Sequence, residues 1–231
     1  MKIESRLQAA IARMHEPWGG VHSLDFANTL EPRGGPPPLT LPPGYRVRDE
    51  LSTYDDLVAW SAHKGAIETE SAEVVLGEAD ADPAGAQAIL MRAYCLRDAV
   101  YCAFWQIAQG AEPSREDISV IMREYVDAAH HATLIVSESG IDWSWLEHET
   151  SLARPLWPVA HSALNLLSTG DRQRLKVCPG PGRPPLSCGW LFYDTTKNGS
   201  RRWCSMADCG AVTKARLQTT RRRVKRAASP S

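Results

Sequence analysis

Near its C-terminus the chain reads RRWCSMADCGAVTKARLQTTRRR, over residues 201–223. Two cysteines, Cys204 and Cys209, stand five positions apart in this stretch, and a dense basic run follows them. Cys178 and Cys188 precede it, which gives the spacing C-x9-C-x15-C-x4-C. Four cysteines grouped in this way form a ligand set for one tetrahedral Zn²⁺ ion.

The size of the segment gives a physical reason to expect a metal. About 50 residues cannot bury enough apolar surface to fold alone, and zinc binding supplies free energy on the order of 10 kcal/mol. Four thiolates leave no open coordination position, so we expect a structural site and not a catalytic one. Disulfides or free thiols are the alternatives, because the gap between Cys178 and Cys188 is longer than the usual spacing within a ligand pair.

The residues around the cysteines predict a hairpin followed by a helix. Trp190 and its neighbours suit a strand, Asn198-Gly199 is a strong hairpin signal, and residues 201–203 would form the return strand. The residues after Cys209 suit a helix. This order predicts a small treble-clef-like Cys₄ zinc module.

Charge is divided unevenly along the chain. Residues 1–171 carry 12 Lys and Arg against 25 Asp and Glu, whereas residues 172–231 carry 14 against 2. An acidic body with a basic end indicates contact with a polyanion, and it also predicts that the two parts attract each other. The sequence shows neither a bilayer-spanning apolar run nor a signal-peptide pattern, so we expect a cytoplasmic protein without membrane contact.

The first part of the chain has the signals of a helical domain. Thr53 and Asp56 predict a capping box, Asp82 is the expected N-cap of a long helix, and Ser114 is the expected N-cap of the next one. Cys95 and Cys102 lie on the long helix too far apart for a disulfide, so we expect both to be buried thiols.

After these helices, the spacing of apolar residues changes from that of a helix to that of strands. Residues 133–146 suggest two short strands around Glu138, Ser139 and Gly140. The sequence therefore predicts a mainly α domain with a small β-hairpin over residues 1–170, followed by the zinc module over residues 171–231.

Two parts of the chain resemble known bacterial families. CGWLFYDTTKNGSRRWCSMADCGAVTKAR, at residues 188–216, resembles the CGNR-type zinc finger, whose pattern is roughly LFxDxSRNxxRRWCSMxxCGNRxKxxR. SLDFANTL, DLVAW and PVAHSALNLLSTGDRQRLKVC resemble the ABATE domain that precedes this finger. The resemblance implies a stress-induced transcriptional regulator that binds zinc through its four finger cysteines: Cys178, Cys188, Cys204 and Cys209.

This chain departs from the finger pattern at one point that matters. The Asn and Arg that follow Cys-Gly in the family are Ala211 and Val212 here. The change removes either one polar contact to nucleic acid or one hydrogen bond within the finger.

The basic run suits a DNA-binding helix. Arg and Lys side chains on such a helix can neutralise phosphates, and Arg and Gln can also read base edges in a major groove. The side chains that we expect to contact duplex DNA are Arg201, Arg202, Lys214, Arg216, Gln218, Arg221, Arg222, Arg223, Lys225 and Arg226. A solvated tail, docking onto the acidic domain and contact with another protein are the alternatives.

The sequence suggests one further site. His22, Asp25 and Asn28 lie at helical spacing, where they could line a pocket for a small-molecule effector or could simply hydrogen-bond nearby backbone. The chain contains none of the common catalytic motifs, so we do not expect an enzyme. The predicted function is a DNA-binding transcription regulator, in which the zinc site presents the basic helix to DNA and the helical domain senses a signal or forms a homodimer. The alternative is a protein-interaction adaptor whose zinc module is only a scaffold.

Overall fold

The structure is a computed structural model that describes residues 2–14, 16, 18–36, 46–137, 140–145, 150–180 and 188–227. Its helices are α1 (Ile3–Ile11), α2 (His22–Ala27), α3 (Tyr54–His63), α4 (Thr69–Ala81), α5 (Pro83–Ala108), α6 (Arg115–His130), α7 (Trp157–Thr169) and α8 (Ala211–Ala227). Three short helical turns are η1 (Arg154–Leu156), η2 (Arg172–Arg174) and η3 (Met206–Gly210). Antiparallel pairs are formed by β1 (Leu30–Glu31) with β2 (Arg48–Asp49), β3 (Ala132–Ser137) with β4 (Gly140–Trp145), and β5 (Leu175–Val177) with β6 (Leu191–Tyr193).

The helix starts follow the capping residues seen in the sequence. The capping box of α3 is confirmed, because the Thr53 hydroxyl accepts the Asp56 N–H at 3.2 Å and the Asp56 carboxylate accepts the Thr53 N–H at 3.0 Å. Asp82 caps α5 by accepting the Gly85 N–H at 2.9 Å. Ser114 likewise caps α6. Each cap satisfies N–H groups that the first helical turn leaves free.

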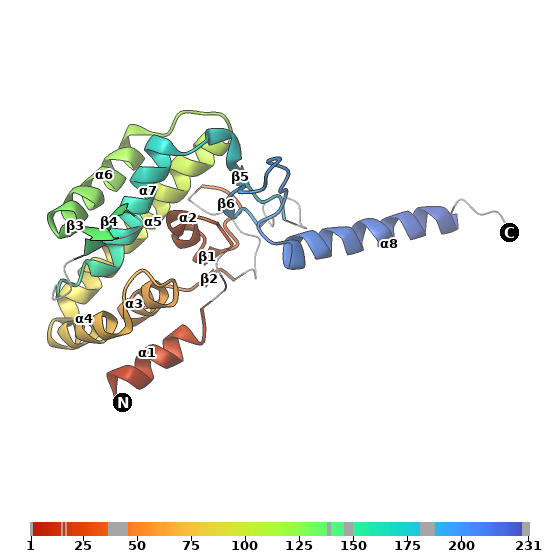
Figure 1. Ribbon diagram of the computed structural model, residues 1–231. Coiled ribbons are helices and arrows are strands. Elements are labelled where there is room, and N and C mark those ends of the chain that lie inside the picture. Colours follow the sequence, from red (N-terminus) through yellow and green to blue (C-terminus); the bar gives the residue numbers. More distant parts are fainter. Residues whose placement is uncertain are drawn as a thin grey trace.

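Helix α5 lies at the centre of the helical body (Figure 1). It packs against α2, α3, α4 and α6, and also against β5 and β6. The core around it contains fully buried Trp60, Tyr101 and Phe26. The predicted mainly α body is therefore confirmed.

The strands β3 and β4 form the predicted hairpin of this body, although its turn residues Glu138 and Ser139 lie outside the described residues. Leu134 faces Trp143 across the hairpin, and Val136 faces Ile141. These four side chains share one face because directly paired residues point to the same side of a sheet.

The strand β6 pairs with a different partner from the one expected. Residues 201–203 form no strand, and β6 pairs instead with β5, which comes before Cys178. Leu175 of β5 and Leu191 of β6 are buried in the same core as the helices. This burial explains the pairing, because the local Asn198-Gly199 turn offers the return strand no comparable apolar surface.

Helix α8 extends away from the helical body (Figure 1). It continues directly from η3, and nearly all of its described side chains are exposed. The structure does not place it on the acidic body, where charge attraction alone would have put it. Among the described residues, no helix has the length and apolar character needed to cross a bilayer.

Candidate metal centre and nucleic-acid interface

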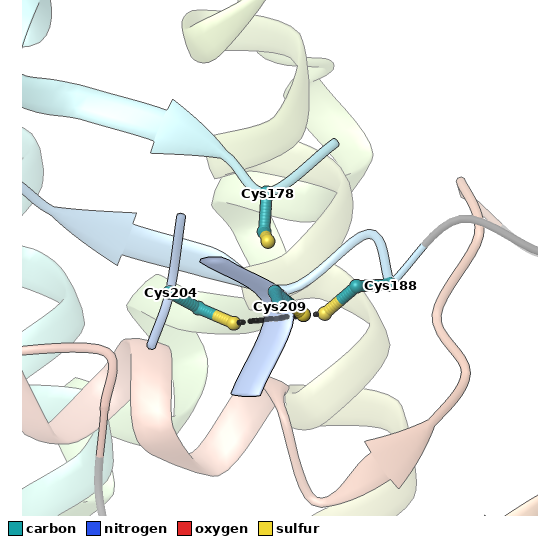
Figure 2. Close-up of side chains that lie close together, drawn as sticks. All are labelled: Cys178, Cys188, Cys204 and Cys209. Atoms are coloured by element: carbon teal, nitrogen blue, oxygen red, sulfur yellow. Dashed lines mark hydrogen bonds between the residues drawn. The ribbon is translucent and has the colours of Figure 1, made fainter. Parts of the chain in front are cut away.

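The four predicted zinc ligands converge from separate short segments (Figure 2). Cys178 follows β5, Cys188 lies shortly before β6, Cys204 precedes η3 and Cys209 lies within it. The close-up shows their sulfur atoms turned toward one common point.

The sulfur positions fit a tetrahedral metal ion. All four Sγ atoms lie within 4.8 Å of one another. The Cys188 and Cys204 sulfur atoms are 3.7 Å apart, and those of Cys204 and Cys209 are 3.9 Å apart. Zn–S bonds of about 2.3 Å in a tetrahedron place the sulfur atoms about 3.8 Å from each other.

The same closeness couples the ionisation of the four thiols. Contacts with Cys188, Cys204 and Cys209 hold the pKa of Cys178 far below that of a free thiol, whereas the contact with Cys178 raises the pKa of Cys188. A divalent cation among the sulfur atoms favours the thiolate form of all of them.

Backbone hydrogen bonds join the first two ligands to the hairpin. The Cys178 N–H donates to the Trp190 carbonyl at 2.8 Å, and the Gly189 N–H donates to the Cys178 carbonyl at 3.1 Å. The pairing of β5 with β6 thus sets the separation of Cys178 and Cys188.

Polar side chains of the helical body hold this hairpin in place. The Asn28 amide donates to the Leu191 carbonyl at 2.8 Å and accepts the Leu191 N–H at 2.9 Å. The Tyr101 hydroxyl donates to the Gly189 carbonyl at 2.8 Å. Both side chains are buried, so water cannot replace these bonds without a cost.

Cys188 and Gly189 also lie close to the body. The Arg33 N–H donates to the Cys188 carbonyl at 3.1 Å, and the Arg33 guanidinium is buried over the Tyr101 ring. Gly189 has a φ of 70°, and a Cβ there would collide with the backbone of Gly34. Only glycine allows this approach of the zinc loop to the body.

Arg201, one of the predicted DNA contacts, makes several contacts within the finger. Its guanidinium donates to the carbonyls of Trp18 at 2.7 Å and Trp203 at 3.0 Å, and also to the carbonyl of Cys204. It also lies 4.7 Å from the centre of the Phe192 ring. Arg201 therefore stabilises the backbone around Cys204, one of the metal ligands.

Asp194 stabilises the loop that leads to Arg201 and is fully buried. Its carboxylate accepts from the Lys176 ammonium at 2.6 Å, the Thr196 hydroxyl at 2.6 Å and the Arg201 N–H at 2.8 Å. Burial alone would raise the pKa of Asp194, but these hydrogen bonds outweigh it and lower the pKa well below the usual range.

The remaining predicted DNA-contact residues lie in two places. Arg202 is exposed, with its guanidinium 5.5 Å from the centre of the Trp203 ring. Five others are exposed side chains of α8: Lys214, Arg216, Gln218, Arg221 and Arg222. The side chains of Arg223, Lys225 and Arg226, on the same helix, lie outside the described part of the structure.

The three residues expected at an effector pocket have other roles. Asn28 holds Leu191, and the Asp25 carboxylate accepts the Gly19 N–H at 2.7 Å. The His22 ring lies 4.9 Å from the Trp60 ring, and its buried Nε2 atom has no hydrogen-bond partner among the described residues. Burial and the nearby Lys64 charge lower the pKa of His22 to about 4. The described geometry thus supports the alternative of local structural roles.

Sequence reasoning missed several residues that position the metal centre. Lys176, Arg33 and Tyr101 make contacts between segments that are distant in the chain, and no local pattern marks them. Asp194 falls on the Asp of the finger pattern, but the pattern does not reveal its partner Lys176. The prediction that Cys95 is buried is wrong, since its side chain is exposed.

Comparison with known families agrees with this arrangement. Residues 20–170 match the ABATE family, described as "Putative stress-induced transcription regulator". The chain belongs to the ABATE family. Residues 174–222 of this ABATE protein match the CGNR zinc finger, in the expected order. No curated protein sequence matches the chain significantly.

The family match and the sulfur geometry together identify the bound metal. A CGNR zinc finger with its four cysteines at ligating distance holds one structural zinc ion. The ligands of this ABATE protein come from the loop after β5, the loop before β6 and the segment leading into α8. One ion therefore ties the base of the basic helix to the helical body.

Proposed function

We propose that the chain is a transcription regulator that binds duplex DNA through α8. The observation that carries the proposal is the position of this helix, whose exposed basic side chains stand clear of an otherwise acidic body. Arg221 and Arg222 have no carboxylate partner among the described contacts, so phosphates can take that place.

The dimensions of α8 suit a DNA groove. Its 17 residues make a helix about 25 Å long, and the major groove of B-DNA, about 12 Å wide, admits a helix. The zinc-bound Cys209 fixes the start of the helix, which limits the freedom lost on binding. Lys214, Arg216 and Gln218 lie nearest this fixed end, and in this proposal they contact the DNA together with Arg221 and Arg222.

The test is a titration of duplex DNA with the zinc-loaded protein from low to physiological salt. We expect a log–log slope of several units, and replacement of Arg221 and Arg222 by Gln should reduce it by about two. The control is Arg123→Gln, which removes one exposed charge from α6 and should leave the slope unchanged.

The adaptor alternative makes a different prediction in the same experiment. Zinc-loaded protein would then show no salt-dependent affinity for duplex DNA, and the Arg221 and Arg222 variants would behave as the wild type. That result would reject the proposed function and leave the zinc module as a scaffold.

We further propose that the β3–β4 hairpin joins two copies of the chain. Near its base, Trp143 and Trp145 pack against His161 and Trp157 of the body. Its far end carries Val136, exposed by 83%, and Ile141, exposed by 67%, on the same apolar face. A second copy would cover that face and would bring two α8 helices to two DNA half-sites, as dimeric DNA-binding proteins commonly do.

Sedimentation of the zinc-loaded protein tests this contact. We expect a dimer for the wild type and a monomer for Val136→Glu. Val74→Glu, which changes an equally aliphatic but isolated exposed residue of α4, is the matched control and should remain a dimer. A monomeric wild type at high concentration would reject the contact.

A further inference from the structure

A cavity of about 280 Å³ adjoins the metal centre on the side of Cys188, Cys204 and Cys209. Its other described lining residues are two tryptophans and two acidic residues: Trp18, Trp190, Glu31 and Asp208. The volume is near the lower end of the roughly 300–1,000 Å³ range of small-molecule sites.

Trp18 and Trp190 form the aromatic part of the cavity lining. The ring centres of Trp18 and Trp190 are 6.0 Å apart, and the ring planes are tilted by 48°. The rings therefore contact each other without stacking face to face. A ligand in the cavity would lie beside them, mainly against Trp18, because Trp190 is buried. Indole is the aromatic side chain that attracts a cation most strongly.

The two described lining residues with charged side chains, Glu31 and Asp208, are both acidic. Glu31 is exposed, and the described part of the chain gives it neither an ion pair nor a side-chain hydrogen bond. Arg48, its neighbour across the β1–β2 pair, donates instead to the Arg13 carbonyl at 3.0 Å. Asp208, which lies in η3, is also exposed. Among the described contacts, its carboxylate accepts one hydrogen bond, from the Ser205 hydroxyl.

The metal centre adds to this negative character. Four thiolates around one Zn²⁺ carry a net charge of about −2. No basic side chain is among the described residues that line the cavity. The acidic lining therefore favours a cation over an anionic ligand or a DNA phosphate, although the Arg201 guanidinium lies nearby on the Trp18 and Cys204 carbonyls.

We propose that this cavity binds a small organic cation, with a quaternary ammonium group held against Trp18 and Trp190 and balanced by Glu31 and Asp208. An alkylated ammonium group suits the site better than a metal ion, because its methyl groups lose little hydration when they contact indole. The proposal goes beyond DNA binding and stands independently of it.

The position of the cavity gives such a ligand access to the base of the basic helix. Asp208 and Cys209 both lie in η3, which leads directly into α8. A cation bound beside Asp208 therefore contacts the segment that sets the direction of α8.

The test uses choline and tetramethylammonium chloride as probes, added to the zinc-loaded full chain at constant ionic strength. Binding is followed by tryptophan fluorescence and by calorimetry. We expect saturable binding of both cations, and about tenfold weaker binding of 3,3-dimethylbutanol, the uncharged counterpart of choline. Absence of saturation at millimolar concentrations, or equal binding of the uncharged compound, would overturn the proposal.

Two variants separate the carboxylate from the aromatic contribution. Glu31→Gln should weaken cation binding several-fold without changing zinc content, and Glu70→Gln on α4 is the matched control for loss of an exposed charge. Trp18→Leu should abolish the fluorescence response and the calorimetric signal. Its zinc content and melting temperature verify that it folds. Unchanged affinity of the Glu31 variant, or of the folded Trp18 variant, would place the cation elsewhere.

Discussion

The zinc finger has two halves, before and after η3, and some of their basic residues have opposite surroundings. In the half before η3, the Lys176 ammonium donates to buried Asp194, and the Arg201 guanidinium donates to backbone carbonyls. In the half after η3, Arg221 and Arg222 are exposed on a helix that leaves the body. The first half uses Lys176 and Arg201 to hold the fold, and the second half leaves Arg221 and Arg222 available to a partner.

This difference shows that a run of basic residues in a sequence is not one functional unit. Arg201 and Arg222 are chemically identical and belong to the same basic stretch. Their roles separate because Arg201 lies next to carbonyl groups of the zinc loop that need donors, whereas Arg222 lies on the outer part of α8. Burial and unsatisfied backbone groups decide which charges become structural.

Removal of zinc should cause the largest loss of structure in the two halves of the finger. Chelation withdraws free energy on the order of 10 kcal/mol from the finger, so both halves should lose their structure, including α8, which has little helix-stabilising packing of its own. Circular dichroism should report the loss of helix, and Cys204→Ser should reproduce it.

Cys95→Ser is the control for that experiment, because Cys95 is exposed and lies outside the zinc cluster. It should retain both zinc and helix content. If α8 kept its helicity after chelation, the zinc ion would not be what fixes the basic helix.

Loss of the Asn28 amide should have an intermediate effect on stability, through the half of the finger that precedes η3. Asn28→Ala leaves the Leu191 N–H and carbonyl buried without their partners, which should cost roughly 3 kcal/mol of unfolding free energy. Urea unfolding measures this loss. Asn165→Ala, at an exposed position of α7, should change stability by less than about 0.5 kcal/mol. Equal effects of the two variants would contradict the anchoring role.

Acid should weaken the body through His22, with a smaller effect. Because burial lowers the pKa of His22 from 6.5 to about 4, the folded state binds fewer protons than the unfolded state between these values. The stability is complete above pH 6.5 and should fall as the pH drops toward 4, by about 2–3 kcal/mol in total.

The variant His22→Leu isolates this contribution, since the imidazole Nε2 makes no hydrogen bond that would be lost. Its melting temperature should depend less on pH over that range than that of the wild type. His130→Leu, at an exposed position, should keep the full dependence. An identical pH profile for wild type and His22→Leu would show that the imidazole is accessible to protons in the fold.

Local signals in the sequence predicted local structure well. The caps at Thr53, Asp82 and Ser114 formed as expected because a cap needs only residues within one helical turn. The zinc ligands were also predictable, since cysteine spacing within a short segment restricts the possible chemistry.

Contacts between distant segments account for what the sequence did not predict. The strand β6 pairs with β5 because both add apolar side chains to the core around α5, and no turn signal contains that information. Asn28 was identified as a polar residue of interest, but its partner lies 163 positions away in the chain. The inward role of Arg201 depends on carbonyl groups whose positions only the folded structure reveals.

The measurement that tests this account most directly compares Arg201→Gln with Arg222→Gln in two assays. Thermal unfolding and the salt dependence of duplex-DNA affinity are measured on the same zinc-loaded samples. The account predicts a crossed result: Arg201→Gln lowers the melting temperature and leaves the salt slope unchanged, whereas Arg222→Gln leaves the melting temperature unchanged and lowers the slope by about one. If both variants changed the same quantity in the same way, the division into a structural half and a DNA-binding half would be contradicted.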